Sequence, residues 1–235
     1  MKITFLGTGS YPTKARNSQS TLIQFDNNKA VIVDCGEGTQ RQLMQLSFIP
    51  EIEAIFLTHH HIDHIAGLPG LIMYLYSITK KRIKIIAPGK ALEISRVLVK
   101  ALVEFIENPA DYIEVCESSS WRFGDVKANT FRTFHTIDSV GYSFKHKGVK
   151  FTICGDLSFQ NREQRYHIIK AIEGSDSAVI DIVHLKDKDS LELLEYFRDI
   201  NKILIPTPIG RDELIKKALK INGTIIPNDF DFLQI

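Results

Sequence analysis

The chain has 235 residues, of which 44% are hydrophobic and 24% are charged, a composition that indicates an ordinary globular protein and excludes a disordered one. Its 29 basic and 28 acidic side chains leave a net charge of +1, which gives no whole-protein attraction for nucleic acid or anionic membranes. A chain of this length buries about 70% of its unfolded surface, so it needs no metal in order to fold, and any metal serves chemistry.

Short runs rich in Val, Ile and Phe alternate with helical patterns along the whole chain, which predicts one domain over residues 1–235. Hairpin signals at residues 26–28 and 146–148 exclude a purely parallel sheet. Two similar halves suggest an α/β (α+β) fold of four layers, with two mixed sheets facing each other and helices outside. The predicted strands are residues 3–6, 21–25, 30–33, 54–57, 83–86, 112–115, 126–131, 142–144, 151–153, 178–183 and 203–205.

Three helices are predicted from their end signals and spacing. The first begins at Thr39, where a capping box would let the Gln42 side chain reach back to the Thr39 amide. The second begins near Leu68, with Pro69 suited to its first turn. The third has apolar residues at every third or fourth position over residues 94–105, so it should cover a sheet.

The cysteines indicate a reduced, cytoplasmic protein. Cys35, Cys116 and Cys154 are odd in number and show no C-x-x-C spacing. No apolar run approaches the roughly 18 residues of a membrane-spanning helix, and residues 1–9 are too short and glycine-rich for a signal peptide. We therefore expect no membrane partner.

A dense histidine cluster follows the strand predicted at residues 54–57. It reads His59, His60, His61, Ile62, Asp63, His64, a pattern expected by chance in about one chain in a thousand. In an extended segment His59 and His61 share a face and can bind one ion, while the following turn directs Asp63 and His64 to a neighbouring position and His60 points away. Imidazole and carboxylate together suit zinc best, with manganese or iron as alternatives.

This H-x-H-x-D-H pattern resembles the metallo-β-lactamase superfamily. Residues 5–10, 34–43 and 55–70 more specifically resemble its ribonuclease Z (tRNase Z) branch. Residues 134–142 and 154–156 resemble later motifs of the branch, in the same order. The resemblance implies an αββα sandwich in which His59, His61 and His135 hold one metal, Asp63 and His64 hold a second, and Asp156 touches both.

Asp34 ends a predicted strand beside a glycine turn. It can hold that turn through backbone hydrogen bonds, or orient a metal-bound histidine, and these two roles are compatible.

Two features depart from the branch. Its pattern has one more histidine after a late strand, but residues 206–210 contain none. His184 lies about where the branch carries a His-Glu-Ala-Thr motif, with Leu185 in place of Glu, and it can be a proton donor, a substitute ligand or a structural histidine. The long arm that grips tRNA in several relatives is replaced by a tight hairpin at residues 145–150, which counts against specific tRNA binding.

The resemblance implies a zinc-dependent hydrolase of the tRNase Z type, acting on an RNA 3′ end or a smaller phosphodiester. Asp63 would orient a metal-activated water, and His184 is the candidate for protonating the leaving oxygen. Two alternatives stay open: a hydrolase of another ester, lactone or thioester, and a degenerate protein that binds metal or RNA without turnover. The missing histidine favours the degenerate protein, and the intact first-metal set argues against it.

The resemblance also implies a homodimer, for which the apolar helix beginning near Leu68 is a candidate interface. The same apolar pattern is equally that of a helix packed on its own sheet.

Overall fold

The computed structural model describes residues 1–10, 13–26, 28–102, 113–115, 120–200, 202–204 and 210–235. The chain divides into two compact units, and each is described by itself. The first unit comprises Met1–Ser118 and Asn228–Gln234, and the second comprises Ser119–Pro227 with Ile235. The single domain expected from the sequence stays a prediction.

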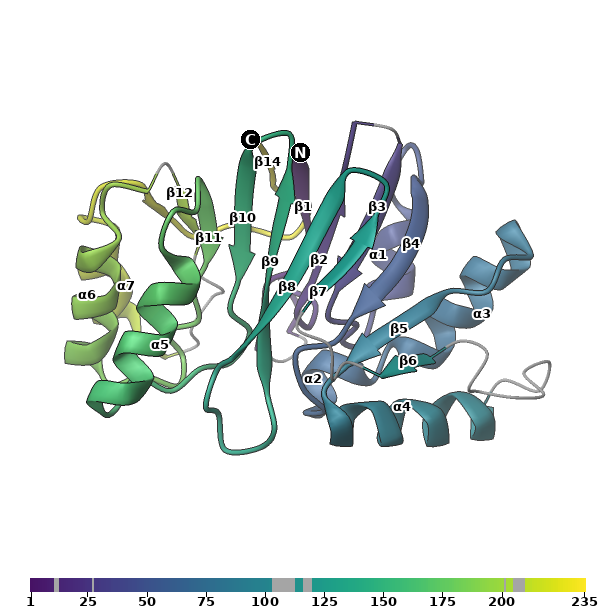
Figure 1. The fold of residues 1–235 in the computed structure, drawn as a ribbon, viewed down its shortest axis with the longest axis horizontal. Coiled ribbons are helices and arrows are strands. Elements are labelled where there is room, and N and C mark those ends of the chain that lie inside the picture. The colour runs from purple at the N-terminus through teal and green to yellow at the C-terminus, as the bar shows by residue number, and fades with distance from the viewer. Residues whose placement is uncertain (11–12, 27, 103–112, 116–119, 201, 205–209) are drawn as a thin grey trace. The chain divides into compact units, whose positions relative to one another are not determined.

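The first unit contains a seven-stranded mixed sheet (Figure 1). Neighbours from β14 to β3 pair antiparallel, and neighbours from β3 to β6 pair parallel. In sheet order the strands are β14 (Phe232–Gln234), β1 (Lys2–Gly7), β2 (Ser20–Gln24), β3 (Lys29–Val33), β4 (Glu51–Phe56), β5 (Lys84–Ala87) and β6 (Ile113–Val115).

Helices of the first unit bury their apolar stripes in one core with this sheet. Leu68, Leu71, Ile72 and Leu75 all lie in that core, beside strand residues such as Ile55. The apolar residues near Leu68 are therefore used by the helix's own unit, and a homodimer stays a prediction. The helices are α1 (Thr39–Met44), α2 (Ile62–Ile65), α3 (Leu68–Thr79) and α4 (Gly89–Leu102).

The predicted starts of α1 and α3 are confirmed, but the capping box is wrong. Gly38 precedes α1 with a φ of 87°, and no side chain caps the helix. The Thr39 hydroxyl donates to the Gly36 carbonyl at 2.8 Å, and the Gln42 amide donates to the Asp229 carboxylate at 3.2 Å. The Thr39 amide, which the capping box would pair with Gln42, donates to the Gly36 carbonyl at 3.3 Å instead, and Gln42 Oε1 accepts from the Gln45 side chain at 2.8 Å. The end of the helix predicted at 94–105 lies outside the described residues.

The second unit contains the other seven-stranded mixed sheet (Figure 1). Strands β7 to β10 pair antiparallel, and strands β10 to β13 pair parallel. In sheet order they are β13 (Thr224–Ile225), β12 (Lys202–Leu204), β11 (Ser177–Val179), β10 (Val149–Ile153), β9 (Val140–His146), β8 (Val126–Arg132) and β7 (Ser120–Phe123). The helices are α5 (Arg162–Ile172), α6 (Asp187–Tyr196) and α7 (Asp212–Ala218).

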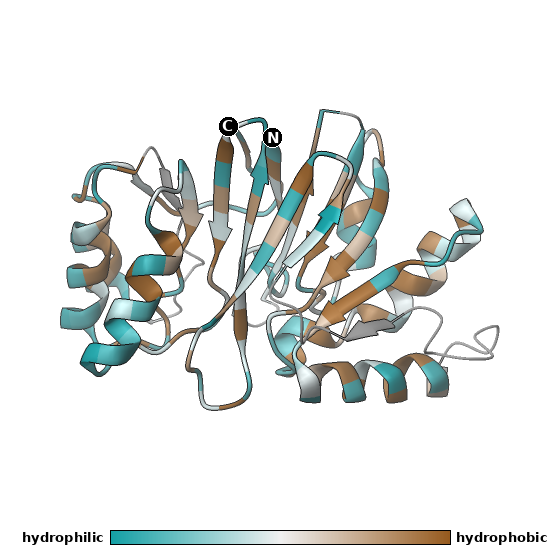
Figure 2. Ribbon diagram, viewed as in Figure 1, coloured by the Kyte–Doolittle hydropathy of each residue, from teal (hydrophilic) through white to brown (hydrophobic). Residues whose placement is uncertain are grey.

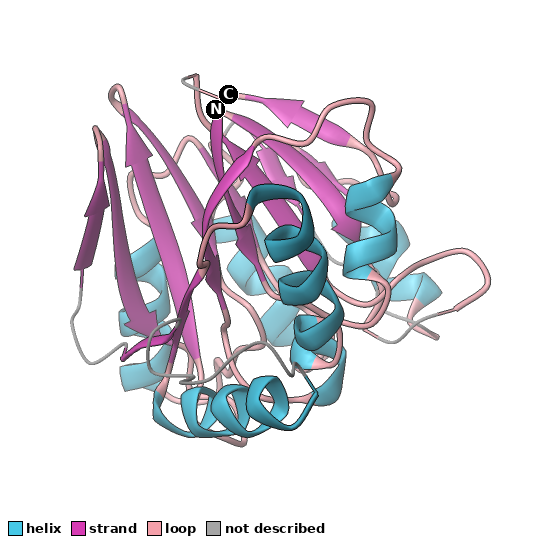
Figure 3. Cartoon of the chain, turned by 90° about the vertical axis from the view of Figure 1, so that its right-hand side faces the viewer, coloured by secondary structure: helices cyan, strands magenta, loops and turns pink. Residues whose placement is uncertain are grey.

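The alternation of buried and exposed positions explains these elements. Figure 2 shows helices with one hydrophobic and one hydrophilic side, and Figure 3 shows where helices and strands lie in the chain.

The hairpin predicted at residues 146–148 joins β9 to β10, and Lys147 and Gly148 both have positive φ, at 49° and 85°. Two positive φ values are the requirement of a type I′ hairpin turn.

The strand predicted at residues 178–183 is too long. β11 ends at Val179, because the Asp181 carboxylate accepts a hydrogen bond from the Val183 amide at 2.7 Å and folds the chain into a turn. The sequence did not predict the short edge strands β13 and β14 or the edge strand β7, since edge strands need little apolar alternation. Among the described residues, no helix has the length and apolar character needed to cross a bilayer.

Candidate metal centre

The loop from β4 to α2 brings His59 and His61 together. His59 is buried, and its Nε2 lies 3.0 Å from His61 Nδ1. His61 has extended backbone angles (φ −63°, ψ 148°), so the two imidazoles lie on the same face as expected. Two imidazole nitrogens bound to one tetrahedral zinc lie about 3.4 Å apart. The spacing of this pair therefore fits a shared divalent metal.

Asp63 and His64 lie in α2, which is a short helix rather than the expected turn. Both side chains are buried, and His64 Nε2 lies 3.6 Å from Asp63 Oδ2. The His59 and His64 ring centroids are 4.1 Å apart. Three histidines and one carboxylate of the first unit thus gather at the end of β4.

Asp34 makes the contacts that both of its predicted roles require. It has a φ of 60°, and its Oδ1 accepts a hydrogen bond from the Thr58 amide at 2.8 Å. Its Oδ2 lies 2.8 Å from His64 Nδ1. The same carboxylate therefore holds the start of the histidine loop and fixes the orientation of one imidazole.

Thr58 is a supporting residue that the sequence reasoning missed. Its hydroxyl lies 3.0 Å from both Asp34 carboxylate oxygens and 2.9 Å from His59 Nδ1. The Nδ1 atoms of His59 and His64 thus both have polar partners, so Nε2 is the candidate ligand atom of each ring. A threonine next to a histidine cluster is the only sequence signal for this role.

Two glycines let α2 approach the turn after β3. A Cβ on Gly36 would lie 2.1 Å from the Asp63 carbonyl oxygen, and a Cβ on Gly67 would lie 2.2 Å from the Gly36 carbonyl oxygen. The Cys35 amide donates to the His64 carbonyl at 2.8 Å. These backbone contacts fix α2, and so fix Asp63 and His64.

The second unit brings His135 and Asp156 together. His135 follows β8, and its amide donates to the Ser139 hydroxyl at 3.1 Å. Asp156 follows β10, and its Oδ2 lies 3.6 Å from His135 Nε2. The Ser158 amide donates to the Thr133 carbonyl at 2.8 Å, which ties the two loops to each other.

His184 lies against the same carboxylate. Its Nε2 is 3.4 Å from Asp156 Oδ2, and its ring centroid is 4.7 Å from that of His135. Its Nδ1 lies 2.8 Å from Asp181 Oδ2. Ligand atoms of Asp156, Asp181 and His184 all lie within 4.8 Å of one another. His184 therefore lies in a polar cluster with Asp156 and Asp181, and its role stays a prediction.

Asp181 is the second residue that the sequence reasoning missed. Burial raises the pKa of its carboxyl, and the hydrogen bond with His184 opposes that rise. Arg211 supports the turn, since its guanidinium donates to the carbonyls of Ile182 and Val183. The only signal in the sequence was an aspartate three residues before His184.

The sequence-predicted residues thus belong to two separate sets. The first unit carries Asp34, His59, His61, Asp63 and His64, and the second carries His135, Asp156 and His184. The loop that lacks the expected histidine, residues 206–209, lies outside the described residues. Imidazole and carboxylate donors of both sets suit a divalent metal.

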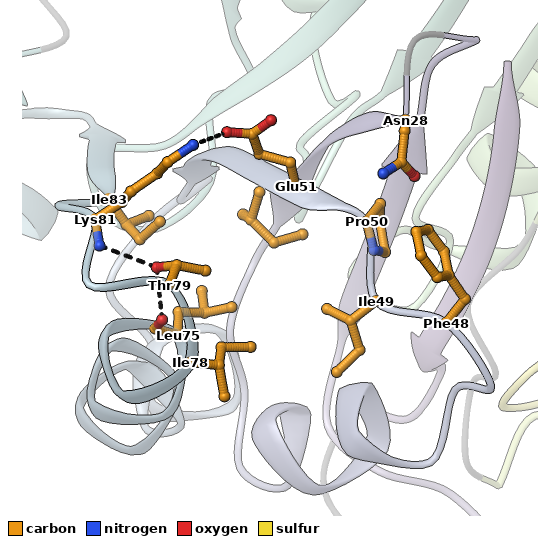
Figure 4. A pocket seen from close by; sticks show the side chains of 11 residues that line it. Asn28, Phe48, Ile49, Pro50, Glu51, Leu75, Ile78, Thr79, Lys81 and Ile83 are labelled. Atoms are coloured by element: carbon orange, nitrogen blue, oxygen red, sulfur yellow. Dashed lines mark hydrogen bonds and ion pairs between the residues drawn. The ribbon is translucent and has the colours of Figure 1, made fainter.

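A separate cavity of about 430 Å³ lies in the first unit, between the start of β4 and the end of α3 (Figure 4). Its lining is mostly apolar, with Phe48, Ile78 and Ile83 around it, and an ion pair of Lys81 with Glu51 at its edge. None of the predicted site residues lines it. It is therefore distinct from the histidine cluster.

Comparison with known proteins identifies the family of the chain. Residues 1–173 match the family model of anti-Pycsar protein Apyc1. A ribonuclease Z from Methanococcus maripaludis strain C5 is 31% identical over 242 residues, which cover all of this chain and 70% of the relative. One from Methanopyrus kandleri is 36% identical over 145 residues, covering 59% of this chain and 48% of the relative. The chain spans from about half to two thirds of the length of the first curated relatives it matches.

The fold also matches a solved structure. The crystal structure of the short form of human tRNase Z has a TM-score of 0.74 and 23% sequence identity, and the match covers 100% of this chain and 99% of that one. This confirms the mixed α/β fold with two sheets that the sequence predicted. The chain belongs to the anti-Pycsar protein Apyc1 family and to the ribonuclease Z-like branch of the metallo-β-lactamase superfamily.

Proposed function

We propose that the chain is a metal-dependent phosphodiesterase of the tRNase Z type, which hydrolyses a phosphodiester in an RNA 3′ end or in a smaller molecule. The observation that carries this proposal is the arrangement around Asp34 and Thr58, whose contacts engage the Nδ1 atoms of His59 and His64 and make each Nε2 the candidate ligand atom for a metal. The names of the curated relatives favour phosphodiester hydrolysis over ester, lactone or thioester hydrolysis.

The metal in this proposal is zinc, which imidazole and carboxylate donors suit best. Following the resemblance, His59, His61 and His135 would hold one ion, Asp63 and His64 would hold another, and Asp156 would contribute to both sites. Bound there, zinc would supply a water activated near neutral pH and would neutralise charge that develops on phosphoryl oxygens.

In this proposal Asp63 and His184 transfer the protons of the reaction. Asp63 orients the attacking water and accepts its proton, while oxygen bonds to phosphorus and the bond to the leaving oxygen breaks. His184 Nε2 donates a proton to that leaving oxygen. Asp181, at 2.8 Å from His184 Nδ1, holds the imidazole in place and stabilises its protonated form.

The proposal includes a cytoplasmic location, an RNA partner and a homodimer. The described cysteines, Cys35 and Cys154, are buried and free, which suits a reducing compartment.

Metal analysis joined to a generic assay tests the proposal. Purified full chain should contain close to two equivalents of zinc and hydrolyse bis(p-nitrophenyl) phosphate. His61→Ala and Asp63→Ala should abolish this activity, whereas the neighbouring control His60→Ala should retain it. Less than half an equivalent of metal, or hydrolysis of p-nitrophenyl acetate alone, would contradict the proposal. Cleavage of a precursor tRNA with a 3′ extension, measured beside these, decides between RNA and a smaller substrate.

A further inference from the structure

Four basic residues from four different strands of the second unit lie in one row. The β-sheet register pairs Arg122 with Lys127, Lys127 with Lys145, and Lys145 with Lys150. Directly paired residues of antiparallel strands point to the same face of a sheet. We call these four residues the cationic row. Its residues lie up to 28 positions apart in the sequence. The row therefore concentrates positive charge locally in a chain whose net charge is only +1.

The row costs stability when it has no anionic partner. Neighbouring strands lie about 4.8 Å apart, and like charges placed opposite each other are destabilising. Arg122, Lys127 and Lys145 form no ion pair with any residue that the structure describes. Arg122 and Lys145 are exposed, and Lys127 is partly exposed.

Lys150 closes the row at one end. Its Nζ donates to the carbonyls of Ala171 at 2.8 Å and Glu173 at 2.7 Å, at the C-terminal end of α5. Burial lowers the pKa of Lys150, and the nearby positive charge of Lys145 adds to that effect. Lys150 is therefore committed to its own fold, and three cations remain for a ligand.

A second row of polar side chains runs beside the first on the same face. Ser120 pairs with Asn129, and Asn129 pairs with Ser143. Ser120 is exposed and Asn129 partly exposed, while Ser143 is buried. The exposed part of this face thus combines three cations with a hydroxyl and an amide, which are the groups that bind phosphate and sugar oxygens.

We propose that the cationic row binds the phosphate backbone of a single-stranded RNA segment. Three cations spaced about 4.8 Å apart cover about 10 Å, a length over which an extended single strand places two or three successive phosphates. The choice of RNA over another polyanion rests on the proposed phosphodiesterase function. Such contacts position a strand without reading its sequence.

Fluorescence anisotropy of a labelled 12-nucleotide oligouridine, titrated with the full chain in a series of NaCl concentrations, tests this inference. Three phosphate contacts predict a slope of log affinity against log salt of about −2. Lys127→Gln with Lys145→Gln should make that slope shallower by about 1.4 and weaken binding at low salt. The control Lys216→Gln with Lys217→Gln, which removes two basic residues of α7, should bind like the unchanged chain.

Two further measurements separate this inference from the proposed function. The Lys127 and Lys145 variant should hydrolyse bis(p-nitrophenyl) phosphate at the unchanged rate and should melt at the same or a higher temperature. Unchanged RNA binding by that variant would contradict the proposal that the cationic row binds RNA, and would leave the phosphodiesterase proposal intact. If poly-glutamate competed as well as unlabelled RNA, the RNA-binding proposal would also be contradicted, because the surface would then bind polyanions or peptides without selecting RNA. Row-dependent RNA binding by a protein without metal or hydrolysis would instead contradict the phosphodiesterase.

Discussion

Asp34 Oδ2 lies 2.8 Å from His64 Nδ1, although the two residues are 30 positions apart. Both side chains are buried, with exposed fractions of 3% and 0%. Asp34 also accepts hydrogen bonds from the amide and hydroxyl of Thr58. This contact couples the end of β3 to the histidine loop and fixes the orientation of the His64 imidazole.

Asp34→Asn should lower metal affinity by about 10- to 100-fold, the usual effect of removing such a supporting carboxylate. The amide oxygen can still accept from Thr58, but the amide NH₂ donates toward His64 Nδ1. That favours the tautomer with a proton on Nε2, which cannot bind a metal. Competition with a chromogenic chelator measures the affinity, and Asp199→Asn at an exposed position is the control. Equal affinities of both variants would show that Asp34 has no such role.

His184→Ala should retain its metal content and lose activity in a substrate-dependent way. Hydrolysis of an RNA with a 3′ extension should fall by about 10²- to 10⁴-fold, as for loss of a general acid. Hydrolysis of bis(p-nitrophenyl) phosphate should fall much less, because p-nitrophenolate leaves without a proton. Asp181→Asn should show the same pattern more weakly. A loss of one metal equivalent in His184→Ala would instead identify His184 as a ligand.

Gly36→Ala should destabilise the protein by at least about 1–3 kcal/mol, the range for overpacking a tight site. Its Cβ would lie 2.1 Å from the Asp63 carbonyl oxygen, a backbone atom that cannot move away. Gly70→Ala is the matched control, since its Cβ meets only the flexible end of Gln40 and lies within α3. Alanine there should stabilise the helix by about 0.5–1 kcal/mol. Chemical denaturation of both variants measures the difference.

Cys35 and Cys154 should resist alkylation in the native protein. Burial raises the pKa of both thiols well above the usual range, and only the thiolate reacts. In a chain carrying Cys116→Ser, raising the pH from 7 to 9 should leave both thiols unmodified by iodoacetamide. In denaturant both should react, and faster as the pH rises. Rapid native labelling at pH 9 would show that neither site is closed to solvent.

The sequence by itself determined most of the elements and the clustering of His59 and His61, two of the candidate ligands. Residues 59–64 form one local segment, so backbone geometry alone brings His59 and His61 to one face. Val-rich and Ile-rich runs located most strands, since burial on one face leaves a periodic pattern in the chain. Resemblance over the motifs supplied His135 and Asp156, which no local spacing connects to the cluster.

Only the tertiary structure decided which distant partners the polar side chains choose. Gln42 bonds Asp229 rather than its own helix end, and Asp181 ends β11 early and pairs with His184. The cationic row exists only through strand register, which sets Lys127 opposite Lys145. Periodicity reports how a residue lies relative to its own element, whereas hydrogen-bond partners and register depend on long-range packing between elements, which a local pattern does not encode.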